Sequence, residues 1–100
     1  MINSNETTRK LSENAKRTLL LEIELNGKIA LESLLNAIYN KFGITYRILN
    51  AEIEFYSGKN FGKVQLLIDT ELNQHQDLEF YLNHSRVLNT FIDYPHRRAV

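Results

Sequence analysis

The sequence predicts an α+β fold: a ferredoxin-like βαββαβ sandwich with an antiparallel sheet and two helices on one of its faces. Three patterns carry this prediction. Apolar and polar residues alternate over 18–26, apolar residues recur at helical spacing over 31–42, and two extended runs joined by a glycine-containing turn occupy 44–69. A second helical pattern and a last strand follow over 73–94. Right-handed crossovers in the two βαβ halves leave the other sheet face uncovered.

The first strand and the first helix have the clearest patterns. Alternation starts at Thr18, and Asn26 with Gly27 ends the strand. In the helix, Lys41 lies in the last turn and Gly43 is placed to take the left-handed conformation that ends many helices. The apolar stripe of this helix consists of Leu31, Leu34, Leu35, Ile38 and Phe42.

The hairpin changes its side-chain alternation within its first arm. Apolar residues occupy positions 44, 46 and 48 and then 51, 53 and 55, with Leu49 and Asn50 at the change. Because successive strand residues point to opposite faces, the switch indicates a β-bulge or a strand that leaves one sheet and enters another. The turn is expected near 57–60, and Val64, Leu66 and Ile68 share one face of the second arm. We expect the function to lie near the switch.

The second helix is expected to start near Asn73, and a last strand is predicted from Val87 to Tyr94, before Pro95. These bounds give a domain over 18–94, a linker or frayed helix over 1–17 and a tail over 95–100. Residues 1–17 hold few apolar side chains that could offset the entropy of ordering them. The apolar stripe of the second helix consists of Leu72, Leu78, Tyr81 and Leu82.

Charge and composition limit the classes of function. Twelve Lys and Arg residues balance twelve Asp and Glu residues, so no net attraction to nucleic acid or to an anionic membrane is evident. The chain has no cysteine, which excludes disulfides and thiolate metal sites. No window approaches the ~18 consecutive apolar residues of a membrane span, and the N-terminus has no signal-peptide pattern. We therefore expect a cytoplasmic protein.

The uncovered sheet face and the long hairpin both indicate a partner. Leu20, Phe61 and Leu67 are expected on that face, where an apolar cluster is unfavourable in water. A strand over 44–56 would extend about 40 Å at ~3.3 Å per residue, whereas a compact chain of this size has a radius of gyration of about 13 Å. One end of the strand is therefore expected to overhang its sheet and to pair with a second copy of the chain. The alternative is two shorter strands with a kink at Asn50, which need no partner.

Two segments of the hairpin resemble the NIL domain family. They are Gly43-Ile44-Thr45-Tyr46-Arg47-Ile48-Leu49-Asn50-Ala51-Glu52-Ile53 and Gly58-Lys59-Asn60-Phe61-Gly62-Lys63-Val64, and the resemblance extends over about 19–93. NIL domains are found at the C-terminal end of the ATPase subunit of bacterial methionine ABC importers. The resemblance implies an ACT-related regulatory domain that pairs two-fold, binds methionine at or near the pair interface and inhibits import when methionine is bound. It also implies contact, through the parent chain, with the transporter's ATPase and membrane subunits at the cytoplasmic face of the membrane.

The same resemblance supplies the candidate site. The family's Asn-Ile-Leu stretch corresponds to Arg47, Ile48 and Leu49, so an arginine stands at the asparagine position. Arginine offers only hydrogen-bond donors and a fixed positive charge, but it can hold a carboxylate with two parallel bonds. Gly62 also matches the family and, on the core face, permits close approach of a backbone or a ligand. The candidate ligand-binding residues are Arg47, Ile48, Leu49, Asn50, Phe61 and Gly62. The alternative for Arg47 is an ion pair with a glutamate on the open face, and the alternatives for the apolar residues and Gly62 are packing, interface or bulge roles.

RNA binding is an alternative function, because RNA-recognition domains share this topology. The segment 59–66 superficially copies their third-strand consensus. However, Lys63 and Leu66 stand where two of the consensus aromatics belong, and the first strand carries acidic residues instead of an aromatic platform. We therefore expect no nucleic-acid partner.

No motif in the chain predicts an enzyme. His75, His84 and His96 lie at spacings that do not converge on one helical face, and they are expected to be surface residues. No Walker A sequence, dinucleotide-binding turn or nucleophile elbow is present. We expect no catalytic residue, no metal and no cofactor in this segment, even if its parent chain is an ATPase. A dimerisation module without a ligand is the alternative binding function.

Overall fold

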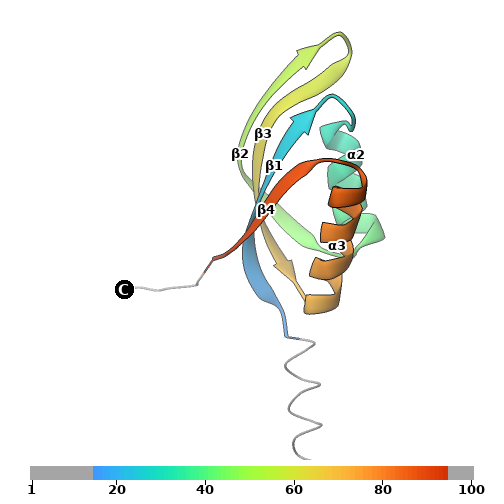
Figure 1. The fold of residues 1–100 in the computed structure, drawn as a ribbon. Helices are drawn as coiled ribbons and strands as arrows, with labels where there is room; N and C mark the ends of the chain where they lie inside the picture. Colours follow the sequence, from blue (N-terminus) through green and yellow to red (C-terminus); the bar gives the residue numbers. More distant parts are fainter. Residues whose placement is uncertain (1–14, 95–100) are drawn as a thin grey trace, which may run out of the picture.

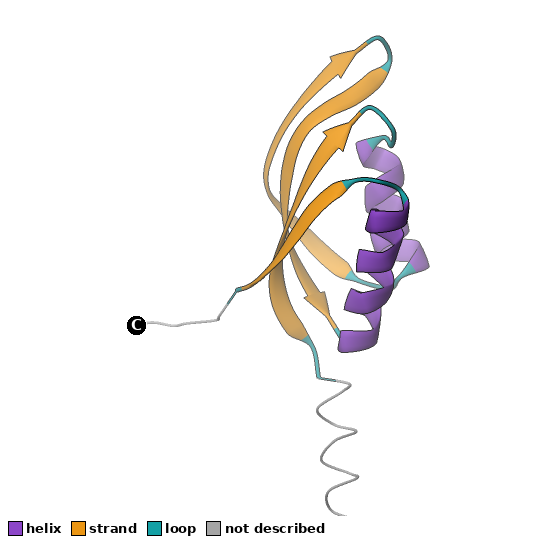
Figure 2. Cartoon of the chain, in the orientation of Figure 1, coloured by secondary structure: helices purple, strands orange, loops and turns teal. Residues whose placement is uncertain are grey.

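The computed structural model describes residues 15–94, which form a four-stranded sheet with helices on one of its faces (Figure 1). The strand order is β2-β3-β1-β4, and every neighbouring pair is antiparallel. Both helical segments lie on the same side of the sheet (Figure 2). The predicted ferredoxin-like α+β fold is therefore confirmed. The elements are β1 (Arg17–Asn26), α2 (Leu31–Asn36), η1 (Ala37–Lys41), β2 (Thr45–Tyr56), β3 (Lys59–Thr70), α3 (Leu72–His84) and β4 (Leu88–Asp93).

The element bounds lie close to the expected ones. Strand β1 starts one residue before the expected Thr18, and β4 is one residue shorter at each end than expected. Apart from residues 15–17, the expected linker lies outside the described residues, as does the expected tail. Within 15–94, neither helical segment has the length and hydropathy that a bilayer-spanning helix needs.

The core lies between the helices and the two central strands. Leu21 on β1 is opposite Leu66 on β3, and both side chains are completely buried. Burying one such side chain contributes about 1.5–3 kcal/mol, which holds the apolar stripe of each helix against the sheet. Leu72 is an exception to the predicted stripe, because as the first residue of α3 it lies at the helix end and stays 41% exposed. The fully buried helical residues are Leu34, Ile38, Leu78 and Leu82.

The first helix widens into a π-helical turn before β2. The N–H of Phe42 donates to the carbonyl of Ala37, five residues earlier, at 3.0 Å. Gly43 follows with a φ of 67°, the left-handed conformation expected for it. The next residue, Ile44, is fully buried and leads the chain into β2.

Asn60 ties the tip of the hairpin to the start of α2. Its backbone carbonyl accepts a hydrogen bond from the N–H of Gly27 at 2.9 Å, and its Oδ1 accepts one from the N–H of Leu31 at 2.8 Å. Asn60 thus caps the helix from a distant strand, because the N-cap residue Ala30 has no side-chain acceptor. The turn itself is only Ser57 and Gly58, with φ values of 52° and 75°.

Helix α3 ends in a Schellman motif in which Arg86 stands where glycine is usual. The N–H of Arg86 donates to the Asn83 carbonyl and the N–H of Val87 to the Leu82 carbonyl, each at 3.0 Å. Arg86 therefore has a φ of 60°, which costs an L residue about 1 kcal/mol. Its carbonyl accepts a hydrogen bond from Asn26 Nδ2 at 3.0 Å, which ties the motif to the end of β1.

Arg86→Gly is expected to raise the free energy of unfolding by about 0.5–1 kcal/mol, because glycine relieves the strained φ and keeps both backbone hydrogen bonds. Urea denaturation followed by circular dichroism measures the change. Arg86→Ala is the control, since alanine removes the guanidinium but keeps the strain and should give no gain. A loss of stability in Arg86→Gly would instead show that the arginine side chain stabilises this corner.

Candidate functional site

The predicted alternation switch is a β-bulge at Leu49. Ile48 is opposite Leu66 and Asn50 is opposite Gln65, so Leu49 is an extra residue in β2. Strand β2 stays continuous and paired with β3 on both sides of the bulge. Two of the expected alternatives, a strand that passes into another sheet and a pair of short strands broken at Asn50, are therefore wrong for the described chain.

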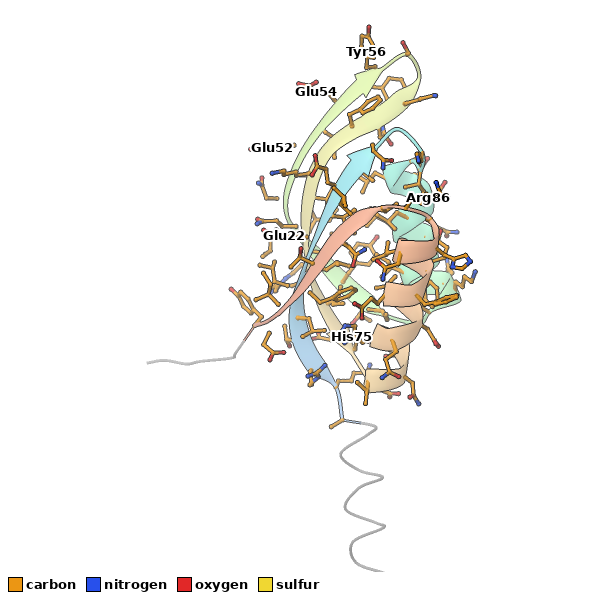
Figure 3. All side chains as sticks on the ribbon, in the orientation of Figure 1. Glu22, Glu52, Glu54, Tyr56, His75 and Arg86 are labelled. Carbon is orange, nitrogen blue, oxygen red and sulfur yellow. The ribbon has the colours of Figure 1, made fainter. Side chains whose placement is uncertain are left out.

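The helix-free side of the sheet, called here the open face, carries its side chains in rows across the strands. Figure 3 shows Glu22, Glu52 and Glu54 on this side, away from the helices. An apolar row that ends in Arg47 is followed by two mostly polar rows. Across β2, β3, β1 and β4 the rows are Arg47-Leu67-Leu20-Ile92, Asn50-Gln65-Glu22-Thr90 and Glu52-Lys63-Glu24-Leu88.

The expected apolar cluster on the open face forms only in part. Leu20 and Leu67 are opposite each other, and Leu67 is only 7% exposed. Phe61 lies beyond the two polar rows, opposite Asn26 at the far end of β1. Its ring lies over Gly27, where an added Cβ would come within 2.8 Å of the ring atom Cζ. Phe61 therefore packs against the end of β1 and not with the two leucines.

The hairpin register divides the six candidate ligand residues into two groups. The first four flank the bulge, whereas Phe61 is opposite Glu54 and Gly62 is opposite Ile53. Gly62 is three residues, or about 10 Å of strand, from Gln65, the partner of Asn50. The structure therefore does not bring the two groups together across the hairpin. The position of the turn in the sequence could have predicted this separation. A two-residue turn at 57–58 that pairs 56 with 59 also pairs 53 with 62.

The close approach expected at Gly62 is made by the neighbouring strand of the same chain. Gly62 has a φ of 128°, and an added Cβ would lie 2.0 Å from the carbonyl oxygen of Glu52 and 3.1 Å from Cα of Ile53. Only glycine allows β2 and β3 to approach in this way. The close approach of the two strands is thus enough to explain why residue 62 is a glycine, without a contact to a ligand.

One hollow on the open face is polar and acidic. It encloses about 400 Å³ over the two polar rows. Gln65 Nε2 donates to Glu22 Oε2 at 2.6 Å across its floor. Three carboxylates and a single ammonium group line it, so its potential is negative. Its polar lining consists of Glu22, Glu24, Asn50, Glu52, Lys63, Gln65, Asn89 and Thr90.

A second hollow lies at the end of the open face where β2 begins, and it contains Arg47. This Arg47 hollow encloses about 420 Å³ and combines one cationic and one anionic side chain with a leucine, two tyrosines and two threonines. Thr18 Oγ1 donates to Asp69 Oδ1 at 2.7 Å at its edge. Sequence reasoning did not select Asp69, although its position on the same strand face as Leu67 was readable. The hollow is formed mainly by Thr18, Thr45, Arg47, Leu67, Asp69 and Tyr94.

His75 is not the surface residue that was expected. Its ring packs on Phe91 with centroids 4.4 Å apart, and its Nδ1 lies 3.4 Å from Arg17 Nη2. Burial lowers the pKa of His75 below 6.5; Glu79 opposes this, Arg17 lowers the pKa further, and Asp93 also opposes it. His75 on α3 thus packs against Phe91 on β4 and lies beside Arg17 on β1. Among residues 15–94, no three His, Asp or Glu side chains are placed to hold a metal ion.

Comparisons with known proteins agree with this architecture. The family model of the NIL domain matches residues 19–88. No curated protein matches the chain. A crystal structure of the C-terminal domain of an ABC transporter/ATP-binding protein from Enterococcus faecalis is similar, with a TM-score of 0.65 and 15% identity, over 91% of this chain and 97% of that chain. At this identity the similar structure shows the fold, whereas the family model covers most of the sequence. The chain therefore belongs to the NIL domain family.

Proposed function

We propose that this NIL domain is an amino-acid-sensing regulatory domain of the ATPase subunit of an ABC importer, with methionine as its ligand. In this proposal the domain works as a homodimer at the cytoplasmic face of the membrane and contacts the other transporter subunits through its parent chain. Family membership and the similarity to the C-terminal domain of an ABC transporter/ATP-binding protein support the transporter context. The observation that carries the proposal is the unpaired edge of β2 beside the Arg47 hollow.

Strand β2 offers a surface for a second copy of the chain. Within the described sheet only β3 pairs with it, so its twelve residues present one free row of backbone groups. A strand of a second copy can satisfy these groups by edge pairing. Dimer formation would also remove the apolar side chains along this edge from contact with water. The exposed ones are Ile48 at 45%, Leu49 at 46%, Phe55 at 76% and Tyr56 at 71%.

Regulation by such a pair is a matter of relative affinity. A ligand that binds one arrangement of the paired domains more tightly shifts the linked transporter toward that arrangement. The shift cannot exceed the difference between the two binding free energies. Bound methionine, in this proposal, favours the arrangement in which import is inhibited.

Ile48→Lys is expected to convert the dimer into a monomer, because a lysine on the edge of β2 opposes strand pairing. Sedimentation equilibrium over a range of protein concentrations measures the change. Ile92→Lys is the matched control, since Ile92 is 44% exposed but lies on β4, the opposite edge of the sheet. A monomeric wild-type chain, or dissociation by Ile92→Lys alone, would contradict pairing through β2.

Calorimetric titration of the chain with the twenty amino acids tests the ligand. Heat from methionine supports the proposal, whereas no heat across the panel with an intact dimer would leave a pure dimerisation module. Retention of RNA at moderate salt would contradict both. The open face argues against that outcome, because Glu22, Glu24, Glu52 and Glu54 would repel a phosphate backbone.

A further inference from the structure

We infer that His75 is a pH-dependent latch for the start of β1, which holds Arg17 while the imidazole is neutral and releases Arg17 when the imidazole is protonated. The latch lies at a corner where β1, α3 and β4 meet. Figure 3 shows His75 at this corner, on α3. The inference goes beyond the proposed function and does not depend on it, because no residue of the corner belongs to β2.

The neutral form of His75 is the one that fits its neighbours. A guanidinium only donates hydrogen bonds, so Nδ1 of His75, which lies 3.4 Å from Arg17 Nη2, must be the unprotonated nitrogen that accepts. The proton of the neutral ring is then on Nε2, which lies 3.7 Å from Glu79 Oε1. Protonation of Nδ1 would therefore place a positive charge directly against the guanidinium.

Arg17 depends on side-chain contacts on one side of its strand. Its backbone is opposite Thr70 on β3, whereas the register of β1 with β4 begins only at Leu19. On the β4 side, the Arg17 guanidinium reaches His75 through Nη2 and Asp93 through Nη1, the latter at 3.8 Å. The Arg17 and Asp93 side chains are 49% and 81% exposed, and so exposed an ion pair contributes little because water screens it. The contact with the imidazole is therefore the more important of the two.

Protonation would displace Arg17 and leave the imidazole in place. The His75 ring packs on Phe91 of β4 with centroids 4.4 Å apart, and an aromatic face attracts a cation at this distance. Glu79 would form an ion pair with the imidazolium across the existing 3.7 Å. Arg17, in contrast, would lose its acceptor and meet a like charge. The long and half-exposed arginine side chain is thus the group that moves.

The surroundings of the ring set the pH at which the latch opens. Burial lowers the pKa of His75 below its usual 6.5; Glu79 opposes this effect, Arg17 adds to it and Asp93 opposes it. Among residues 15–94, these three are the charged groups that act on the ring, from α3, β1 and β4 respectively. The ring is therefore neutral and the latch closed at neutral pH, and the latch opens as the pH falls below 6.5.

Opening of the latch would loosen the end of the sheet where the chain enters the domain. Arg17 is the first residue of β1, and residues 1–16 precede it. The N–H of Tyr94 donates to the carbonyl of Thr18 at 3.1 Å. With Arg17 released, this bond would be the outermost backbone hydrogen bond between β1 and β4 in the described chain. Acidification would thus change how residues 1–16 are attached to the domain without unfolding its core.

Nuclear magnetic resonance of the chain between about pH 8 and pH 5 tests the latch. We expect the ring nitrogens of His75 to show the Nε2–H tautomer at neutral pH and a pKa below 6.5. The amide signals of Thr18 and Tyr94 are expected to shift with the same midpoint. His75→Gln keeps an acceptor for Arg17 but does not titrate, so it should abolish that shift. His84→Gln, at an exposed position on the same helix, is the control and should leave the shift unchanged.

Two charge variants test the partners of the ring. Arg17→Gln should raise the pKa of His75, because it removes a neighbouring positive charge. Glu79→Gln should lower the same pKa, because it removes a negative charge. Lys63→Gln is the matched control for Arg17→Gln, since it removes one positive charge from the polar rows of the open face and should leave the titration of His75 unchanged.

Three results would overturn the latch. An Nδ1–H tautomer at neutral pH would mean that Nδ1 of His75 cannot accept a hydrogen bond from Arg17. A pKa of His75 that Arg17→Gln does not raise would mean that the arginine does not lie beside the ring. Amide signals of Thr18 and Tyr94 that do not follow the protonation of His75 would mean that the strand end is insensitive to the ring.

Discussion

Gly62→Ala is expected to lower the free energy of unfolding by about 3 kcal/mol or more. The added Cβ would lie 2.0 Å from the Glu52 carbonyl oxygen, a distance that no real Cβ maintains, so β2 and β3 must separate locally. The φ of 128° adds strain for any L residue. Together these effects place the substitution among the severe ones for a domain of this size. Urea denaturation of the chain measures the loss.

Gly58→Ala is the matched control for this prediction. Gly58 also has a positive φ, 75°, but an added Cβ there meets no atom within 4 Å. Its substitution should therefore cost only the conformational strain, about 1 kcal/mol. If the two alanine variants are equally stable, the close approach of the two strands at Gly62 is not rigid, and the backbone explanation of this glycine is wrong.

Leu66→Ala is expected to destabilise the domain by about 3–4 kcal/mol, because it leaves a cavity in the middle of the core. Leu66 is completely buried and lies between Leu21 on β1 and Ile48 on β2. The packed strands on both sides limit how far the site can collapse. Thermal or urea unfolding followed by circular dichroism gives the difference.

Leu88→Ala serves as the control for the cavity. Leu88 is 66% exposed at the start of β4, so the same chemical change removes little buried surface and should alter stability by less than about 0.5 kcal/mol. Comparable losses in the two variants would mean that Leu88 is covered in solution. That result would point to a partner on the open face instead of on the edge of β2.

The fold followed from the sequence because most elements kept a regular apolar periodicity. The alternation over β1 and the stripe from Leu31 to Phe42 were enough to fix strand, helix and buried face. The bulge was also readable, since one extra residue at Leu49 shifts every later side chain to the other face. The π-helical turn after α2 was not, because widening one turn leaves the apolar spacing almost unchanged.

The candidate site could be predicted only in part, since its residues come from different strands. Arg47 and Asn50 were selected because they lie in the stretch that resembles the family motif, and both line hollows on the open face. Asp69 and Tyr94 were missed. Asp69 lies on the strand next to Arg47, opposite Thr45, whereas Tyr94 follows β4 and comes near Arg47 only because all four strands pair. Phe61 and Gly62 were placed near the bulge by motif matching, whereas the hairpin register sets them further along.

The tie made by Asn60 has a mechanical consequence. Its two hydrogen bonds join the hairpin tip to the turn after β1 and to the first residue of α2. A displacement of the hairpin tip would therefore strain the hydrogen bond that Asn60 makes to the start of α2. A molecule docked on the edge of β2 that shifted the hairpin tip would thus also perturb the start of α2, through Asn60.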